Sequence, residues 1–95
     1  MRIEYDRGKR AETLALRGID MADAAEVFLG PCLTVEDGRF DYGEPRFLTV
    51  GFLRRRMVIV AWTPRGENRR IISMRKANAR EIARYAEALR AFDRG

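Results

Sequence analysis

The sequence predicts an α+β fold, with N-terminal helices, then an antiparallel β-sheet meander, then a C-terminal helix. Apolar residues recur at helical spacing before residue 30 and after residue 78, whereas positions 46–76 alternate or are continuously apolar, as strands are. Short, turn-rich links between the strand segments favour an antiparallel meander. A chain of 95 residues is long enough for one core and too short for two, so we expect a single domain over residues 1–95.

The N-terminal elements are predicted from the residues that begin and end them. Residues 2–5 can form a short edge strand. Asp6 is a good N-cap for a helix over residues 9–17, and Gly18 can end that helix in a left-handed conformation. Asp20 caps a second short helix. The buried face of this second helix is expected to carry Met21, Ala24, Ala25 and Phe28.

The strands are predicted from alternation and from continuous apolar runs. A strand begins at residues 33–35, and a turn-rich loop over 36–45 separates it from the next strand at 46–52. Residues 57–63 are apolar on both faces, which indicates a central strand with cover on each side. Residues 69–76 form the last strand of the meander.

The last helix is predicted to begin at a capping box. Asn78 is followed three residues later by Glu81, the pattern in which two side chains bind each other's backbone N–H groups. Glu81 is therefore interpreted first as a structural residue. The apolar stripe of this helix is expected to be Ile82, Tyr85, Ala86 and Leu89.

The strand at residues 69–76 is the most informative segment for function, because it alternates basic with apolar side chains. Neighbouring side chains on a strand point to opposite faces, so one face is predicted to carry Arg69, Ile71, Ser73 and Arg75. The other face is predicted to carry Arg70, Ile72, Met74 and Lys76. Guanidinium groups two residues apart stand about 7 Å apart, which suits phosphate binding. We expect arginines of neighbouring sheet segments to converge into one anion-binding pocket, with nucleic acid as the first ligand to test.

Composition limits the classes of protein and of chemistry. A hydrophobic share of 46% with 35% charged residues is typical of a globular domain. The apolar run at 57–62 is too short to span a membrane, the N-terminus lacks a signal-peptide pattern, and a single Cys32 fits a reducing cytoplasm. The absence of histidine excludes a His/Cys zinc site and a Ser-His-Asp triad.

The net charge of +5 includes 19 basic side chains, of which only Lys9 and Lys76 are lysines. This charge indicates either a solvated surface rich in arginine or an electrostatic footprint for nucleic acid or an acidic partner. The run Arg54-Arg55-Arg56 is most often a solvated turn, and as a functional element it would be a non-specific phosphate contact.

Three ordered sets of residues run along the chain. The first is Glu4-Tyr5-Asp6 with Lys9, then Arg17-Gly18-Ile19, Ala24, Ala25 and Val27-Phe28. The second is Gly43-Glu44-Pro45-Arg46 with Gly51. The third is Thr63-Pro64-Arg65-Gly66, then residues 70–77, Glu81 and Tyr85. Together they resemble the BrnT-type toxins, small ribonucleases of type II toxin–antitoxin pairs with a RelE-like fold.

The resemblance implies a cytoplasmic ribonuclease toxin that needs neither metal nor cofactor, does not contact membranes and takes RNA as its substrate. It also implies a BrnA-like antitoxin with a ribbon-helix-helix domain for operator DNA, and a heterotetramer in which an antitoxin dimer bridges two toxins. The chain departs from the family pattern at three places. Thr13 stands where asparagine is usual, Leu16-Arg17 where a Lys-His pair is usual, and Trp62 where many members have histidine.

Metal-independent RNA cleavage needs a base for the 2′-OH, cations for the phosphorane and an acid for the leaving 5′ oxygen. The candidate cations are Arg46, Arg65, Arg70 and Arg75, with Ser73 as a further phosphate donor. Surface salt bridges of Arg46 and Arg70 with Glu44 and Glu67 are the alternative for those two arginines. Candidate bases and acids are Glu44, Glu67, Tyr42, Tyr85 and Lys9.

We therefore expect a catalytic set of Arg65, Arg75, Glu44 and Arg46. The expected RNA-binding set is Arg70, Ser73, Lys9 and Trp62. Trp62 could stack on a base, and burial at the end of the sheet is the alternative. Two other functions fit the same residues: a nucleic-acid-binding module without catalysis, and a ParE-like toxin that acts on a protein target such as gyrase.

Overall fold

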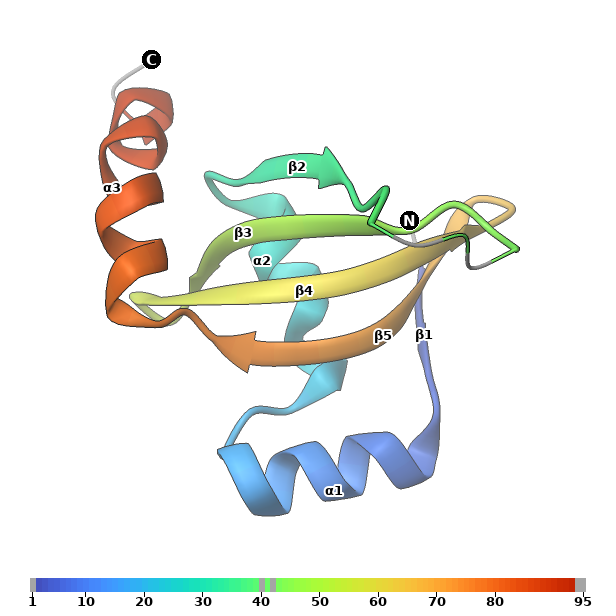
Figure 1. The fold of residues 1–95 in the computed structure, drawn as a ribbon. Coiled ribbons are helices and arrows are strands. Elements are labelled where there is room, and N and C mark those ends of the chain that lie inside the picture. Colours follow the sequence, from blue (N-terminus) through green and yellow to red (C-terminus); the bar gives the residue numbers. More distant parts are fainter. Residues whose placement is uncertain (1, 40, 42, 94–95) are drawn as a thin grey trace.

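The computed structural model describes residues 2–39, 41 and 43–93. These residues form a mostly antiparallel sheet flanked by helices, which confirms the predicted α+β class (Figure 1). The elements in chain order are β1 (Ile3–Tyr5), α1 (Arg7–Arg17), the 3-10 helix η1 (Met21–Asp23), α2 (Ala24–Leu29), β2 (Leu33–Glu36), β3 (Phe47–Leu53), β4 (Arg56–Arg65), β5 (Asn68–Lys76) and α3 (Ala79–Asp93). Among the described helices, none combines the length and the apolar composition that crossing a bilayer requires.

The described strands lie in the order β1-β5-β4-β3-β2. Strands β2 to β5 each pair antiparallel with the next strand in sequence, so the predicted meander is confirmed. The links at 54–55 and 66–67 are shorter than the links expected from the sequence. β1 is an edge strand, as predicted, and it pairs parallel with only the first part of β5.

α1 lies beside the part of β5 that β1 leaves unpaired (Figure 1). Both predicted caps of this helix are confirmed, although the helix begins two residues earlier than expected. The side chain of Asp6 accepts a hydrogen bond from the N–H of Lys9 at 2.9 Å, and Gly18 ends the helix with a φ of 67°. Nη1 of Arg17 donates to the carbonyl of Met74 at 2.9 Å, which ties the helix to the strand.

Asp20 connects α1 with the helix that follows it. Its side chain accepts from the N–H of Ala22, so the predicted cap is confirmed, and it accepts from Nε and Nη2 of Arg10 at 2.7 and 2.9 Å. These hydrogen bonds, with that of Arg10 the largest cause, lower the pKa of Asp20 to about 2.

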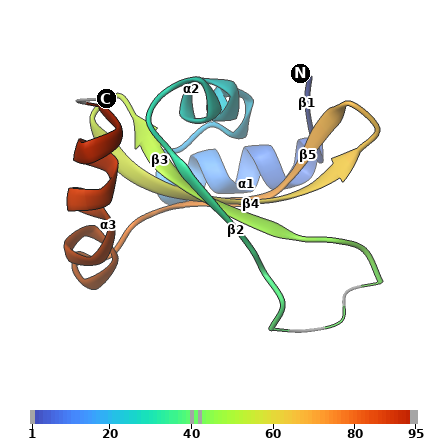
Figure 2. The ribbon, with the colours of Figure 1, turned by 90° about the horizontal axis from the view of Figure 1, so that it is seen from above.

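The sheet has a core on each face, as the two-sided apolar pattern of residues 57–63 predicted. Under η1 and α2, the buried side chains include Met21, Ala24, Val27, Val58, Val60, Trp62, Ile71 and Met74. On the other face, the core formed with α3 includes Tyr85, Ala86 and Leu89 with Val50, Met57 and Ile59. Figure 2 shows α2 on one side of the sheet and α3 at one end of it.

β3 carries a glycine at the place where α2 lies closest to the sheet. A Cβ built at Gly51 would lie 2.8 Å from Cγ1 of Val27 and 3.1 Å from Cβ of Cys32, both shorter than ordinary carbon contacts. Because Gly51 has no side chain, α2 can pack directly against the backbone of β3. Val27 is consequently fully buried, although the spacing analysis did not place it on the buried face.

The predicted division of β5 into two faces is wrong beyond Ile71. Ile71 pairs with Trp62 and Ser73 pairs with Ala61, so Ile72 is an extra residue that forms a β-bulge. The extra residue reverses the alternation, and Ile71 and Met74 both lie in the core under α2. The physical reason is burial: a bulge allows two large apolar side chains three positions apart to share one core.

Candidate functional site

Four of the predicted site residues lie on one face of the sheet. The bulge places Arg70, Ser73 and Arg75 of β5 together on the face that also packs against α3. Arg65 of β4 joins them, because it pairs with Asn68, two positions before Arg70. We call Arg65, Arg70, Ser73 and Arg75 the basic face. Alternation alone had placed Arg70 opposite Ser73 and Arg75.

The arginines of the basic face are spread along the strand. Arg70 pairs with Thr63 and Arg75 with Ile59, four positions apart on β4. Their Cα atoms are therefore about 13 Å apart at the usual rise of a strand, whereas the expected ~7 Å applied to arginines two residues apart. At this spacing the side chains can contact separate phosphates of one nucleic-acid strand, whereas the expected convergence on one phosphate suits the shorter spacing.

Two arginines of the basic face form loose ion pairs. Nη2 of Arg65 lies 3.6 Å from Oε2 of Glu44, and Nη1 of Arg70 lies 3.9 Å from Oε1 of Glu4. Both pairs are partly exposed, so each contributes less than about 1 kcal/mol and can exchange its carboxylate for a phosphate. The alternative salt bridges considered from the sequence paired Arg70 with Glu67 and Arg46 with Glu44. In the structure Arg70 lies beside Glu4, and Glu44 lies beside Arg65.

Arg75 is held by a closer pair. Its Nη1 and Nη2 donate to Oε1 and Oε2 of Glu81 at 2.7 and 2.8 Å. Glu81 also accepts from the N–H of Asn78, whose side chain accepts from the N–H of Glu81, so the predicted capping box is confirmed. The side-chain hydrogen bond with Arg75 lowers the pKa of Glu81 to about 2 and raises the pKa of Arg75. At neutral pH Glu81 is therefore a fixed anion that orients Arg75.

Among the candidate bases and acids, Glu44 contacts the basic face through Arg65. Glu67 is exposed in the β4–β5 turn, and Tyr85 packs in the core under α3. Tyr42 lies outside the described residues. Within those residues, no group of three or more acidic or cysteine side chains is placed to hold a metal ion.

Lys9 and Ser73 come together at the edge of β5. They line a hollow of about 210 Å³ between α1 and the strand, with Arg17 and Ile72 among its other walls. Lys9 therefore brings a positive charge close to Ser73 of the basic face, and Glu12 lines the same hollow. Arg46, the remaining predicted cation, precedes β3 and is half-buried, and its carbonyl accepts from the N–H of Asp37 at 2.8 Å.

Trp62 lies on the face of the sheet opposite the basic face, in the core under α2. It therefore cannot stack on an RNA base that is bound at the basic face. Its side chain is 8% exposed, its ring stacks on Phe47 with centroids 5.0 Å apart, and it meets Phe28 edge-on at 5.7 Å. Its Nε1–H donates to Oγ1 of Thr49 at 2.8 Å. The guanidinium carbon of Arg69 lies 4.6 Å from the Trp62 ring centroid and 4.3 Å from that of Phe28. The structure therefore shows the alternative expectation, in which Trp62 is buried.

The sequence reasoning missed this role of Arg69, which had been assigned to the same face as Ser73 and Arg75. Its charge covers two aromatic rings by cation–π contact. No local spacing signals the arrangement, because the rings of Phe28 and Trp62 come from a distant helix and from the neighbouring strand.

A comparison with family models matches residues 5–81 to the family described as a ribonuclease toxin, BrnT, of a type II toxin–antitoxin system. The match covers the whole basic face and the start of α3 with Glu81. A comparison with curated proteins gives no match. Because the family match extends over most of the chain, the protein belongs to the BrnT family of ribonuclease toxins of type II toxin–antitoxin systems.

Proposed function

We propose that this protein is a metal-independent RNA endonuclease that cuts RNA at the basic face in the cytoplasm and thereby inhibits translation. The observation that carries the proposal is the shared face of Arg65, Arg70, Ser73 and Arg75 on two neighbouring strands. Arginine binds phosphate oxygens in a bidentate manner and keeps its charge at any physiological pH. Family membership supplies the ribonuclease class, and this face supplies the cations that such a reaction needs.

In the proposed reaction the 2′ oxygen of RNA attacks the adjacent phosphorus while its proton passes to a base. The bond from phosphorus to the 5′ oxygen then breaks, and that oxygen takes up a proton. The products are a 2′,3′-cyclic phosphate and a 5′-hydroxyl. Arg75, which Glu81 orients, would bind the charge that develops on the phosphorane, and Arg70 and Ser73 would hold a neighbouring phosphate. Glu44, beside Arg65, lies six positions along β4 from the partner of Arg75, about 20 Å away, so it would act on a different phosphate and is not the base of this step.

Two of the residues that depart from the family pattern have a structural role in this chain. Position 62 faces the core under α2, so a tryptophan in place of histidine removes no group from the basic face. Arg17, in place of the usual histidine, binds the carbonyl of Met74 and so holds α1 against β5. These two positions support structure in this chain.

Cleavage of a labelled messenger RNA in the presence of EDTA tests the proposal. The wild type is expected to cut the RNA and to leave 5′-hydroxyl ends that polynucleotide kinase can phosphorylate directly. Arg75→Ala is expected to lower the cleavage rate by about 100-fold, the usual effect of removing one group that stabilises transition-state charge. Arg75→Lys should recover part of this loss, because it keeps the charge and loses the bidentate geometry. Arg7→Ala, at an exposed position of α1, is the matched control and should cut at the wild-type rate.

A folded wild type that leaves the RNA intact at stoichiometric amounts would refute the catalytic role. If this protein binds the RNA without cutting it, a nucleic-acid-binding module replaces the enzyme. If it neither binds nor cuts RNA, the ParE-like alternative with a protein target such as gyrase is the one to test.

We further propose that the neutralising partner is a BrnA-like antitoxin with a ribbon-helix-helix domain. An antitoxin dimer would bridge two toxins in a heterotetramer that binds operator DNA. Membership in a type II toxin–antitoxin family supports a protein antitoxin, and the net charge of +5 favours an acidic partner. Co-expression with the adjacent gene, followed by light scattering of the purified complex, should give the mass of two toxins and two antitoxins. A complex with the mass of one of each would contradict the bridging.

A further inference from the structure

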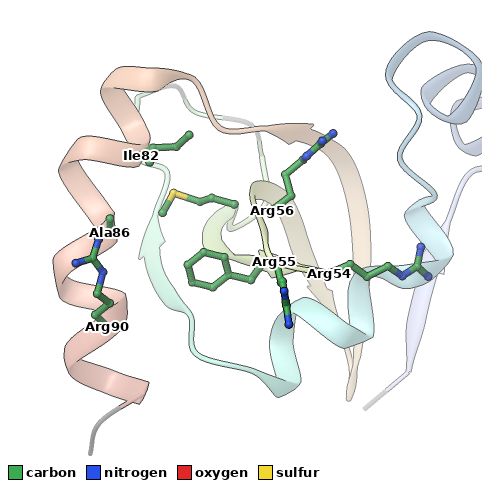
Figure 3. A pocket seen from close by; sticks show the side chains of 8 residues that line it. Arg54, Arg55, Arg56, Ile82, Ala86 and Arg90 are labelled. Carbon is green, nitrogen blue, oxygen red and sulfur yellow. The ribbon is translucent and has the colours of Figure 1, made fainter.

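A groove with an apolar floor and a basic rim lies between the β3–β4 turn and α3 (Figure 3). Its volume is about 590 Å³. The floor is formed by Phe52, Met57, Ile82 and Ala86, and the rim carries the guanidinium groups of Arg55 and Arg90. Arg54 and Arg56 also line the groove, but their side chains point away from it. The groove shares no residue with the basic face, so the proposed RNA site does not explain it.

The apolar floor is partly open to solvent, although Met57 within it is buried. Ile82 was expected to pack against the sheet, but it is 44% exposed, whereas Leu89 of the same helix is fully buried. α3 therefore leaves Ile82 at the mouth of the groove. A second hollow of about 390 Å³, which shares Phe52, Arg55 and Arg90 with the first, continues the groove toward Pro31. A contiguous apolar surface with a polar rim is typical of a docking site.

The β3–β4 turn holds its arginines in an unfavourable conformation. Arg54 and Arg55 have φ values of 49° and 72°, in the left-handed region where glycine or asparagine is usual for a two-residue turn. Arg54 has a structural role, since its N–H donates to Oε2 of Glu26 at 2.9 Å and its Nη2 lies 3.1 Å from Oδ2 of Asp23. Arg55 forms no ion pair with another described residue, so internal contacts do not explain an arginine there.

The charge around the groove has one sign. The guanidinium groups of Arg55 and Arg90 flank the floor, and among the described residues no carboxylate lines either hollow. Within the described part of the chain, Arg54 is compensated by acids of η1 and α2, while Arg55, Arg56 and Arg90 form no ion pair. An occupant that fits must bring carboxylates for the rim and apolar anchors for the floor. A nucleic-acid backbone would satisfy the rim and leave the floor, which is aliphatic apart from Phe52, in water.

We propose that this groove binds an acidic amphipathic helix of the antitoxin. Its apolar side chains would cover the floor, and its carboxylates would pair with Arg55 and Arg90. Ile82, Ala86 and Arg90 follow one another at four-residue intervals along one side of α3, the spacing at which a second helix presents its anchors. The inference rests on the antitoxin partner of the proposed function and is independent of RNA cleavage.

Binding of synthetic peptides, measured by fluorescence anisotropy, tests the groove. The probe is a labelled helical peptide of about 16 residues with leucines on one face and glutamates beside them. In one control peptide lysines replace the glutamates, and in a second control serines replace the leucines. The toxin is expected to bind the Glu–Leu peptide about tenfold more tightly than either control, with an affinity that falls as salt is added.

Variants of the toxin locate the binding. Arg55→Gly is suited to this test, because glycine adopts a φ of 72° without strain and the turn is kept. Arg55→Gly combined with Arg90→Ala, and separately Ile82→Ser, should each weaken Glu–Leu peptide binding by about tenfold. Arg7→Ala is the control and should keep the wild-type affinity. All variants should cut RNA at the wild-type rate, because none of them changes the basic face.

Unchanged peptide affinity in the Arg55→Gly/Arg90→Ala variant would overturn the proposal, and so would equal binding of the Lys–Leu peptide. Displacement of the Glu–Leu peptide by an oligouridine RNA would assign the groove to nucleic acid and would also overturn it. A wild type without ribonuclease activity contradicts the proposed catalysis only, since the peptide affinities test the groove by themselves.

Discussion

Replacing Gly51 by alanine tests how closely α2 packs on β3. The new Cβ would lie 2.8 Å from Cγ1 of Val27, 3.1 Å from Cβ of Cys32 and 3.4 Å from the carbonyl oxygen of Pro31. Unstrained carbon contacts lie at about 3.5–4.0 Å. Val27 cannot turn away, because a β-branched side chain in a helix has one strongly favoured rotamer and Val27 is fully buried. The helix or the strand must therefore shift by several tenths of an ångström.

Such overpacking costs about 1–3 kcal/mol, and the lower freedom of alanine in the unfolded chain offsets about 0.4–1 kcal/mol of it. We expect the free energy of unfolding to fall by about 1–2 kcal/mol, which lowers the Tm by roughly 5–15 °C in a domain of this size. Thermal and urea unfolding followed by circular dichroism measures the change. Gly38→Ala is the matched control, because no atom lies within 4 Å of a Cβ built at Gly38.

A second substitution tests whether the clash itself is the cause. Val27→Ala removes the atom that the new Cβ meets, and alone it should cost about 1–3 kcal/mol through lost burial. In the double variant the shortest of these contacts is relieved, so the loss should be smaller than the sum of the single losses by about 1 kcal/mol. A Gly51→Ala variant as stable as the wild type would refute the close packing. So would a double variant whose loss equals the sum within about 0.5 kcal/mol.

Acid should weaken the fold through Asp20 and Glu81. Hydrogen bonds from their arginine partners hold the pKa of both carboxyls at about 2 in the folded state, so the stabilisation present above their ordinary values of 3.8 and 4.5 is lost as the pH falls toward 2. The Asp20→Asn/Glu81→Gln variant should therefore show a shallower fall of Tm with acid than the wild type, and parallel curves would contradict this. Trp62→Phe should lower the free energy of unfolding by about 1–2 kcal/mol, because the hydroxyl of Thr49 loses a buried donor, and it should leave RNA affinity unchanged. If Trp62→Phe instead weakened RNA binding without a loss of stability, Trp62 would belong to the RNA-binding site.

Secondary structure followed closely from signals that act within a few residues. Asp6 and Gly18 bound α1 because a cap needs only the local N–H groups and the local φ angle. Asn78 and Glu81 begin α3 for the same reason. The meander followed from the short links expected at 53–55 and 64–68, because links of this length join only antiparallel neighbours.

The assignment of side chains to faces and sites depended on contacts between distant segments. Alternation placed Arg70 away from Ser73, but a bulge at Ile72 reunites them, because the register of β5 follows what β4 and α2 bury. The sequence left the ring of Trp62 as a candidate for stacking on RNA. In the structure Phe28, from a helix more than 30 residues earlier, packs against this ring. Likewise, the spacing of α3 predicted a packed Ile82, but the helix lies at the end of the sheet and Ile82 is exposed.

The sequence by itself determined where the helices and strands lie, the excess of positive charge and the exclusion of histidine chemistry. Only the tertiary structure decided which arginines share a face, which acid lies beside each, and that a basic, apolar groove opens beside α3. The physical reason is that propensity and capping are local energies, whereas register, burial and ion pairing are set by the segments that meet in space.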